Sequence, residues 1–419
     1  MSNPSAARPV SIPLEANVST EVEREFLTLG WYCTFLSVIS LLLITAIGSA
    51  GAAGFILIWA AYSAIRPDCV VRSLPLLGML WAFPVLCLVS TVWSEGTMMT
   101  ARFSVQYALT VLFAVIAAQA TPPRQFISAI MSATVIIAVL SLLSGRFETD
   151  PMSGTVTFLG IFASKNYLAF FLSLMFLAAT AVLIDRRQPL MFRAISVIAF
   201  FGASPLIVLT RSATSIVVSV ACIGVLTGAF LFSKMEPKWR ALTVIVALVA
   251  AAYVGAVLAG NAEIFELFIT RVLGKDATLT GRTFLWGKAL ELISLEPLLG
   301  RGFNAFWRHD SLEAEALWRL FHIPNRGGFH FHNTYLEILV GLGYLGFVIF
   351  VATLLVILGR LLLWFMETLS IPSAFFLTVF SSILIRSFVE VDVIYQFQIG
   401  TVLLYAMAVY GKQRHPHER

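Results

Sequence analysis

The chain has 419 residues, of which 59% are hydrophobic and 12% are charged, and its mean hydropathy is +0.89. Soluble domains carry about 25% charged residues, so this composition excludes an ordinary soluble protein. The formal net charge of +5 comes from basic residues scattered over short loops, which excludes a nucleic-acid-binding stripe. Apolar runs long enough to cross a bilayer as helices recur along the chain, without the short alternating segments of a membrane barrel. We therefore expect an all-α, polytopic integral membrane protein.

Hydropathy divides the chain into two groups of apolar helices separated by one long loop. Residues 1–25 are polar and lack the features of a signal peptide, so we expect a cytoplasmic N-terminal tail. Transmembrane helices 1–9 are predicted within 26–258, a large periplasmic loop at 259–332, helices 10–12 within 333–411 and a cytoplasmic tail at 412–419. The predicted spans are 26–47, 49–65, 73–92, 103–120, 126–144, 167–184, 191–209, 213–232, 239–258, 333–358, 373–389 and 395–411.

The distribution of basic residues predicts which loops face the cytoplasm. By the positive-inside rule, connections rich in Lys and Arg are cytoplasmic, and loops longer than about 60 residues are exempt. We therefore expect a multi-pass protein of the bacterial inner membrane, with both termini in the cytoplasm and the long loop in the periplasm. The basic connections contain Arg66, Arg72, Arg124, Arg186, Arg187, Arg193, Lys234, Lys238, Arg240, Arg360 and Lys412, and the opposite ones contain Glu95, Glu148, Asp150, Glu390 and Asp392.

Within the long loop, a helix is predicted over 283–295. Its apolar residues recur on one face with helical spacing, and Pro297 stops it. We expect this helix to lie on the membrane surface over the bundle. The residues of the apolar face are Leu285, Ala289, Leu292 and Ile293.

Two cations lie at the outer mouths of apolar spans, where a charge is costly and is a functional candidate. Lys165, followed by Asn166, precedes one predicted span, and Arg211 precedes another. A helix N-terminus with a nearby cation can bind an anion such as phosphate. The alternative is that each cation reaches interfacial water or a lipid headgroup.

Two arginines of the long loop, Arg282 and Arg301, suit a pyrophosphate, because a guanidinium can bind two oxygens at once and stays charged. Arg282 lies four residues before Trp286, and Arg301 lies between two glycines. The alternative for each is a solvated surface charge, which is the commoner role of a loop arginine.

His332 is the candidate general base. Thr334 and Glu337 form a capping-box pattern, which predicts a helix start and places His332 just outside the membrane. A neutral imidazole at this position can accept a proton near neutral pH. The alternative is an interfacial histidine that hydrogen-bonds to the backbone.

His330 and His332 also raise the question of a metal site, because zinc binds histidine when further ligands are near. The sequence has no HExxH motif, no cysteine in the long loop and few carboxylates near His330. We therefore predict neither a metal nor a cofactor. A nucleotide-binding P-loop is also absent from the sequence, so the substrate of an enzyme here must arrive already activated.

Five short motifs mark the chain from residue 165 onwards. They are Lys165-Asn166, Thr210-Arg211-Ser212, Gly281-Arg282-x-x-Leu285-Trp286, Gly300-Arg301-Gly302-Phe303 and His332-Asn333-x-Tyr335-Leu336-Glu337. In this order they resemble the O-antigen ligase/polymerase superfamily of bacterial membrane glycosyltransferases. The segment Phe303-Asn304-Ala305-Phe306-Trp307 is most similar to exopolysaccharide polymerases of the succinoglycan type.

The resemblance implies a GT-C-like, metal-independent and inverting glycosyltransferase that acts in the periplasm on glycans linked to undecaprenyl pyrophosphate. It implies that His332 is the catalytic base and that Arg211, Arg282 and Lys165 bind the donor pyrophosphate. The expected partners are the lipid-linked oligosaccharide donor, a glycan or lipid-core acceptor, the bilayer and a chain-length regulator as a candidate. Supporting roles fall to Asn166, Trp286, Arg301, His330, Asn333 and Glu337.

Polymerisation of exopolysaccharide or O-antigen repeat units is the first functional hypothesis. Ligation of the glycan to lipid A-core is the alternative, because O-antigen ligases share the His332-Asn333 element. A transporter of lipid-linked glycans would fit twelve spans, but such folds usually show two related halves and charges near the midplane. A structural or sensory protein would leave the loop marked by arginine and histidine unexplained.

Overall fold

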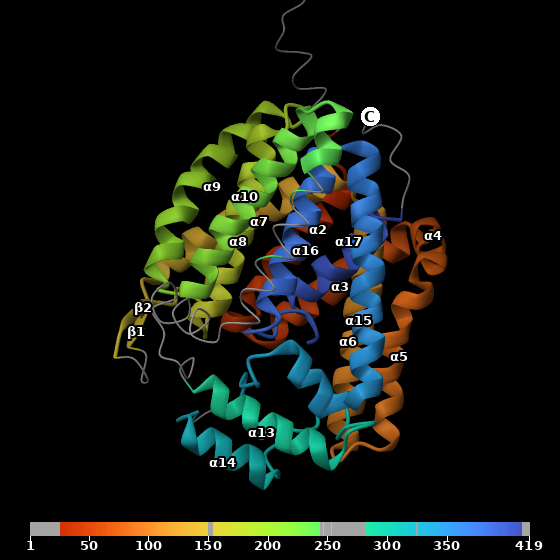
Figure 1. The fold of residues 1–419 in the computed structure, drawn as a ribbon, viewed down its shortest axis with the longest axis vertical. Coiled ribbons are helices and arrows are strands. Elements are labelled where there is room, and N and C mark those ends of the chain that lie inside the picture. The colour runs from red at the N-terminus through yellow and green to blue at the C-terminus, as the bar shows by residue number, and fades with distance from the viewer. Residues whose placement is uncertain are drawn as a thin grey trace, which may run out of the picture.

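Helices form most of the described chain, as a bundle with a smaller helical layer beyond one end (Figure 1). The computed structural model describes residues 26–149, 154–243, 246, 253, 281–323 and 326–412. The layer consists of α13 (Arg282–Leu295) and α14 (Leu312–Leu320). The bundle contains α2 (Leu29–Ile47), α3 (Ser49–Ile65), α4 (Pro67–Leu77), α5 (Ala82–Val89), α6 (Thr97–Ala120), α7 (Pro123–Ser144), α8 (Lys165–Ile184), α9 (Leu190–Leu209), α10 (Ala213–Lys234), α15 (Thr334–Thr368), α16 (Ile371–Arg386) and α17 (Ile399–Tyr410).

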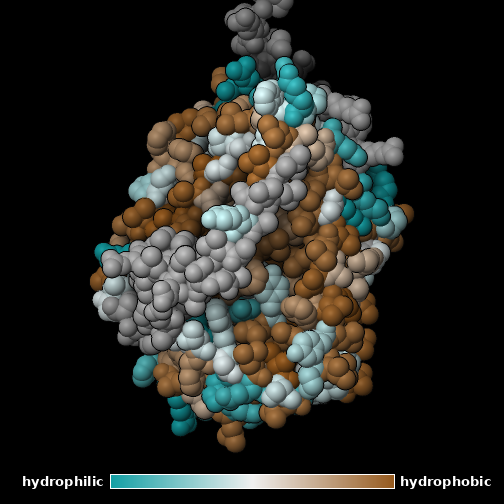
Figure 2. Space-filling model, in the orientation of Figure 1, coloured by the Kyte–Doolittle hydropathy of each residue, from teal (hydrophilic) through white to brown (hydrophobic). Residues whose placement is uncertain are grey.

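Seven helices of the described residues are long and apolar enough to cross a membrane, namely α2, α6, α7, α8, α9, α10 and α15. The bent pair of α3 and α4 is an eighth candidate, and α16 and α17 are shorter apolar helices. Figure 2 shows that hydrophobic residues cover most of the visible face of the bundle. These findings confirm a polytopic helical membrane protein. The predicted span 239–258 lies largely outside the described residues, so the count of twelve stays a prediction. Residues 1–25 and the part of the predicted loop at 259–280 also lie outside them.

The predicted continuous span at 73–92 is instead broken. Helix α4 ends at Leu77, and it lies at 107° to α3. Pro75 has no amide hydrogen to donate within the helix, and Gly78 adopts a φ of +31°, which favours glycine. The chain then continues through the 3₁₀ turn η1 (Gly78–Trp81), helix α5 and the turn η2 (Ser90–Val92).

A β-hairpin that the sequence analysis did not predict precedes α8. Strand β1 (Phe147–Thr149) pairs antiparallel with β2 (Val156–Phe158), and Glu148 lies opposite Thr157. Gly145 ends α7 in the left-handed conformation and turns the chain into the first strand. The hairpin returns the chain to the bundle at Lys165.

Helix α17 is only 12 residues long, yet all of its residues are buried. It packs against α6, α15, α16 and α2. A helix that is hydrophobic on every side belongs in the interior of a larger assembly. By contrast, only 33% of the apolar window of α9, and of α10, is buried inside the protein. The outer helices therefore present apolar surface, whereas α17 forms part of the core of the bundle.

The helical layer has an apolar core of its own. As predicted, Leu285, Ala289, Leu292 and Ile293 of α13 are all buried, and the helix ends before Pro297. These side chains pack on α15 and on the segments around α14. The second core contains Leu285, Ala289, Leu292, Ile293, Phe306, Ala314, Leu317, Trp318, Phe331 and Val340.

Helix α15 is broken at Gly343, whose φ is +61°. The segment that follows α13 lies against the break and takes over hydrogen bonds that a continuous helix would make internally. Two amides of this segment donate to carbonyls before the break, and two amides after the break donate to carbonyls of the segment. The bonds are Arg301 to Val340 at 3.0 Å, Gly302 to Gly341 at 2.8 Å, Tyr344 to Pro297 at 2.8 Å and Leu345 to Leu298 at 3.2 Å.

We predict that Gly343→Ala lowers the apparent Tm of the purified protein. A methyl group at this position would collide with the backbone of Leu298, and the positive φ alone costs about 1–3 kcal/mol in a residue other than glycine. Gly359→Ala is the matched control, because Gly359 lies in the same helix with open space around its Cα. Thermal unfolding in detergent measures both variants, and equal Tm values would contradict the structural role of the break.

Candidate active site

A buried carboxylate lies at the centre of the polar groups between the bundle and the helical layer. Glu390 belongs to the loop between α16 and α17 and is 5% exposed. Its Oε1 accepts hydrogen bonds from Arg282 Nη2 at 2.5 Å and from Asn166 Nδ2 at 2.7 Å. Its Oε2 lies 3.3 Å from Nδ1 of His332. These residues come from four separate segments, so the tertiary fold assembles the cluster.

Glu390 is a carboxylate at neutral pH. Burial by itself raises the pKa of its carboxyl group, but the Arg282 guanidinium and His332 outweigh burial and hold that pKa well below its usual range. A carboxylate can only accept hydrogen bonds, so the Nδ1 atom of His332 must carry the proton between them. The Nε2 atom of a neutral His332 is then an acceptor.

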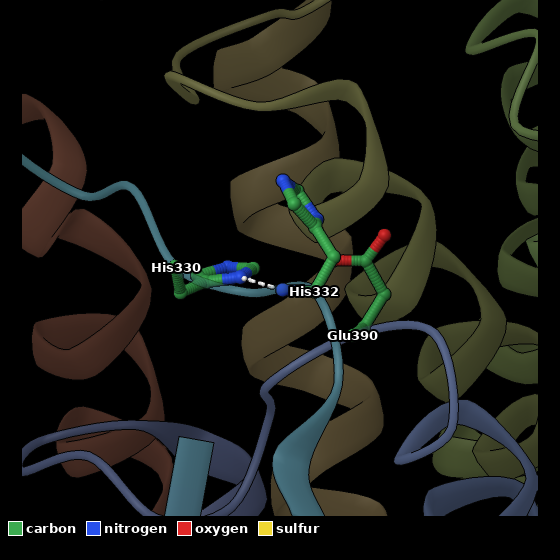
Figure 3. A group of neighbouring side chains, drawn as sticks. All are labelled: His330, His332 and Glu390. Atoms are coloured by element: carbon green, nitrogen blue, oxygen red, sulfur yellow. Dashed lines mark hydrogen bonds and ion pairs between the residues drawn. The ribbon is translucent and has the colours of Figure 1, made fainter. Parts of the chain in front are cut away.

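The backbone of His332 is held in an unusual conformation. Its φ is +51°, which is uncommon for a residue other than glycine, and its side chain is 25% exposed. Figure 3 shows its imidazole beside the Glu390 carboxylate, with the His330 ring next to the His332 backbone. A partly exposed imidazole with one nitrogen held by a carboxylate is suited to accept a proton at the other nitrogen.

His330 has a different part in the cluster from His332. Its Nδ1 accepts a hydrogen bond from the backbone amide of His332 at 3.0 Å, and the two ring centroids are 4.3 Å apart. Desolvation by burial lowers the pKa of His330 to about 3, so this imidazole is neutral at physiological pH. His330 therefore orients the backbone of His332.

The start of α15 corrects one prediction. The sequence pattern indicated Thr334 as the capping residue, but Asn333 caps the helix, and its Oδ1 accepts from the amides of Tyr335 and Leu336. The Thr334 hydroxyl instead donates to the backbone carbonyl of Glu390 at 2.8 Å. A hydroxyl one residue inside the helix is thereby free to hold the Glu390 loop.

Glu337 and Trp286 fix the segment that carries the two histidines. Glu337 is buried, and its carboxylate accepts from the Phe331 amide and from Trp307 Nε1, each at 2.9 Å. Trp286 Nε1 donates to the Phe331 carbonyl at 3.0 Å. Phe331 is thus held at both its amide and its carbonyl, one residue before His332.

Lys165 and Arg211, the two cations predicted at the ends of apolar spans, lie close in sequence to Asn166 and to its hydrogen-bond partner Ser212. Lys165 is the first residue of α8 and precedes Asn166. Arg211 lies in the turn between α9 and α10, is exposed, and its side chain makes no hydrogen bond or ion pair with the described residues. The neighbouring Ser212 hydroxyl donates to Asn166 Oδ1 at 3.0 Å.

Arg301 belongs to a separate group of ions. Its buried side chain forms ion pairs with Glu95 at 3.5 Å and Glu313 at 3.2 Å. These contacts join the turn before α6 to the start of α14. They place the Arg301 side chain between two carboxylates and outside the contacts of Glu390 and His332 that the structure describes.

In the sequence, Glu390 indicated topology only and was not among the predicted site residues. The available signal was the same as for Lys165 and Arg211, namely a charge at the mouth of an apolar span. The distribution of basic residues had, however, already assigned this loop to the outer side, and an acidic residue in such a loop needed no site to explain it.

The cluster also has the composition of a metal site. Ligand atoms of His330, His332 and Glu390 lie within 4.8 Å of one another, and three protein ligands are enough for a catalytic zinc. Two observations favour hydrogen bonding instead. His330 Nδ1 already accepts an amide hydrogen, and the Arg282 guanidinium occupies the carboxylate that a cation would need.

The fold and the cluster are those of a polytopic membrane protein with cations and a histidine gathered between its bundle and an outer layer. Residues 198–351 match the family described as O-antigen ligase. The chain is 33% identical over 344 residues to the exopolysaccharide production protein ExoQ of Rhizobium meliloti (strain 1021), covering 81% of this chain and 78% of that protein. The chain therefore belongs to the O-antigen ligase/polymerase superfamily, which confirms the predicted resemblance. Its members are membrane polysaccharide polymerases and ligases.

We predict that Glu390→Gln lowers glycan transfer by about 10²-fold or more, because the neutral amide no longer favours a proton on His332 and leaves Arg282 without its anion. Glu291→Gln is the control, since Glu291 lies exposed on α13, where it pairs with Lys288. A transfer assay on purified protein, normalised to folded protein, measures both. Parental activity in Glu390→Gln would show that Glu390 has no role in glycan transfer.

Proposed function

We propose that the protein transfers an undecaprenyl-pyrophosphate-linked glycan to the hydroxyl of an acceptor sugar on the periplasmic side of the bacterial inner membrane. By doing so it polymerises exopolysaccharide or O-antigen repeat units. The observation that carries the proposal is the contact of His332 with Glu390, which directs one imidazole nitrogen to the carboxylate and leaves the other for substrate. Both termini lie in the cytoplasm in this proposal, as the basic connections predict.

The proposed reaction is a single displacement. His332 Nε2 takes the proton of the acceptor hydroxyl, and the acceptor oxygen bonds to the anomeric carbon of the donor. The bond from that carbon to the pyrophosphate oxygen breaks, and its electron pair leaves with the pyrophosphate. Attack on the face opposite the leaving group inverts the anomeric configuration.

Cations of the chain stabilise the leaving group in this proposal. Arg282 uses one nitrogen for Glu390, and a guanidinium has five donors, so others can bind pyrophosphate oxygens. Arg211 and Lys165 lie one residue from the Ser212 and Asn166 pair, at the starts of two helices. Fixed cations in a partly dry site stabilise a developing charge strongly, and here they supply the charge that a metal would supply elsewhere.

Polymerisation is favoured over ligation by the relative from Rhizobium meliloti, which is an exopolysaccharide production protein. A ligase would instead attach the glycan to lipid A-core, and assays with the two acceptors distinguish these products. Transport of lipid-linked glycans is less favoured, because the described cluster lies at one end of the bundle and is asymmetric. A chain-length regulator is the proposed protein partner of a polymerase.

We predict that Arg282→Lys loses most transfer activity, at least about tenfold. A lysine keeps the charge but cannot form two parallel hydrogen bonds to the donor while holding Glu390. Arg319→Lys is the matched control, because Arg319 lies on α14 and is 78% exposed. Equal activity of the two variants in the transfer assay would refute the pyrophosphate role of Arg282.

We predict that His332→Ala lowers the rate of glycan transfer by about 10²–10⁴-fold, which is the usual contribution of a general base. His330→Ala should be much milder, because His330 only orients the backbone of His332. The assay is run on purified protein with lipid-linked donor, with and without EDTA. A metal site would make both substitutions severe and the parental activity sensitive to EDTA, and full activity of His332→Ala would eliminate the base.

A further inference from the structure

A second buried ion pair, between Arg386 and Asp392, belongs to the same stretch of chain as Glu390. Arg386 ends α16, and its side chain is 2% exposed. Its Nε donates to Asp392 Oδ2 at 2.7 Å, and its Nη2 lies 3.4 Å from Asp392 Oδ1. The Asp392 side chain is 8% exposed. The two residues flank Glu390 in sequence, four residues before it and two after it.

The Arg386 guanidinium also contacts the helices that hold Asn166. Nη1 donates to the Ser215 hydroxyl at 2.9 Å, and Nη2 lies 3.4 Å from the Asn166 carbonyl. The guanidinium lies over the Phe170 ring at 4.7 Å. The Arg386 side chain thus joins α16 to α8 and α10.

The backbone of Glu390 is held by the same residue. The amides of Val389 and Glu390 donate to the Arg386 carbonyl at 2.8 and 2.7 Å. The Arg386–Asp392 pair therefore closes the loop on both sides of Glu390. Asn166, which donates to the Glu390 carboxylate, is held in turn by Arg386 and by Ser212.

We propose that Arg386 and Asp392 are positioning residues of the transfer reaction: Asp392 keeps the Arg386 guanidinium away from Glu390, so that the Glu390 carboxylate stays on His332. This proposal rests on the proposed role of His332 as the base. Neither Arg386 nor Asp392 needs to touch the substrate, since both act through Glu390.

The charges of the cluster explain why Asp392 is needed. Each of the two carboxylates has its own arginine, Arg282 for Glu390 and Arg386 for Asp392. Without the negative charge of Asp392, Arg386 would be a buried cation whose nearest anion in sequence is Glu390. A buried charge that loses its partner is strongly unfavourable, so the guanidinium would turn to Glu390 and compete with His332.

The test compares Asp392→Asn and Asp310→Asn in the transfer assay, with kcat measured at saturating donor across pH and normalised to folded protein. Asp310 pairs with Arg308 at the surface and is 77% exposed, so its variant is the matched control. We expect Asp392→Asn to lower kcat at least tenfold and to move the acid limb of its pH profile to lower pH. The limb moves because a carboxylate drawn away from an imidazole no longer favours the protonated ring. The charged and titratable groups that the structure places around His332 and Glu390 include Arg282 on α13 and His330, two residues before His332.

A double variant separates positioning from general stability. If Asp392 acts through Glu390, Asp392→Asn should cause little further loss in a Glu390→Gln background. Restoring neutrality with Arg386→Gln in the Asp392→Asn variant should recover part of kcat, because the competing cation is gone. A purely structural pair would lower the yield of folded protein and leave kcat and the pH profile of the folded fraction unchanged, and that result would overturn the proposal.

His332→Ala in the same assay distinguishes failure of the proposed function from failure of the positioning role. Full activity of that variant would refute the base on which the proposal rests. A disabled His332→Ala together with a parental kcat and pH profile in Asp392→Asn would leave the base in place and refute the positioning role alone.

Discussion

The buried ion pair between Glu390 and Arg282 joins the helical layer to the bundle. Arg282 is the first residue of α13, and Glu390 lies on the loop between two helices of the bundle. Each charge is more than nine-tenths buried, which is tolerable only because the other is present. The contacts of His332 and Asn166 add to this pair. The site therefore forms only when the helical layer packs on the bundle, because its residues come from separate segments of the chain.

Hydropathy was sufficient to predict a helical membrane protein, because the residues of each membrane-spanning helix are mostly apolar. Helical spacing was sufficient for α13, whose four predicted apolar residues are all buried. The sequence also singled out Arg282 and His332, but it could not show that both contact Glu390. That contact depends on how distant segments pack, and the chain separates Arg282 from Glu390 by 108 positions.

Backbone geometry accounts for the local errors. Asparagine and threonine both cap helices well, and a one-residue shift between Asn333 and Thr334 changes no hydropathy pattern. The same holds for 73–92, where apolar composition continues through Gly78 although the helix does not. Composition reports which surface a segment buries, whereas breaks and caps depend on single residues whose conformation is settled by their neighbours.

The break in α15 has a consequence for biogenesis. The loop segment that completes the hydrogen bonds around Gly343 precedes α15 in the chain, so it is synthesised first. If α15 enters an apolar environment before that segment lies against it, the amides of Tyr344 and Leu345 lack their carbonyl partners. The final shape of α15 therefore depends on docking of the segment that follows α13. Folding of α15 and packing of the helical layer are therefore coupled steps.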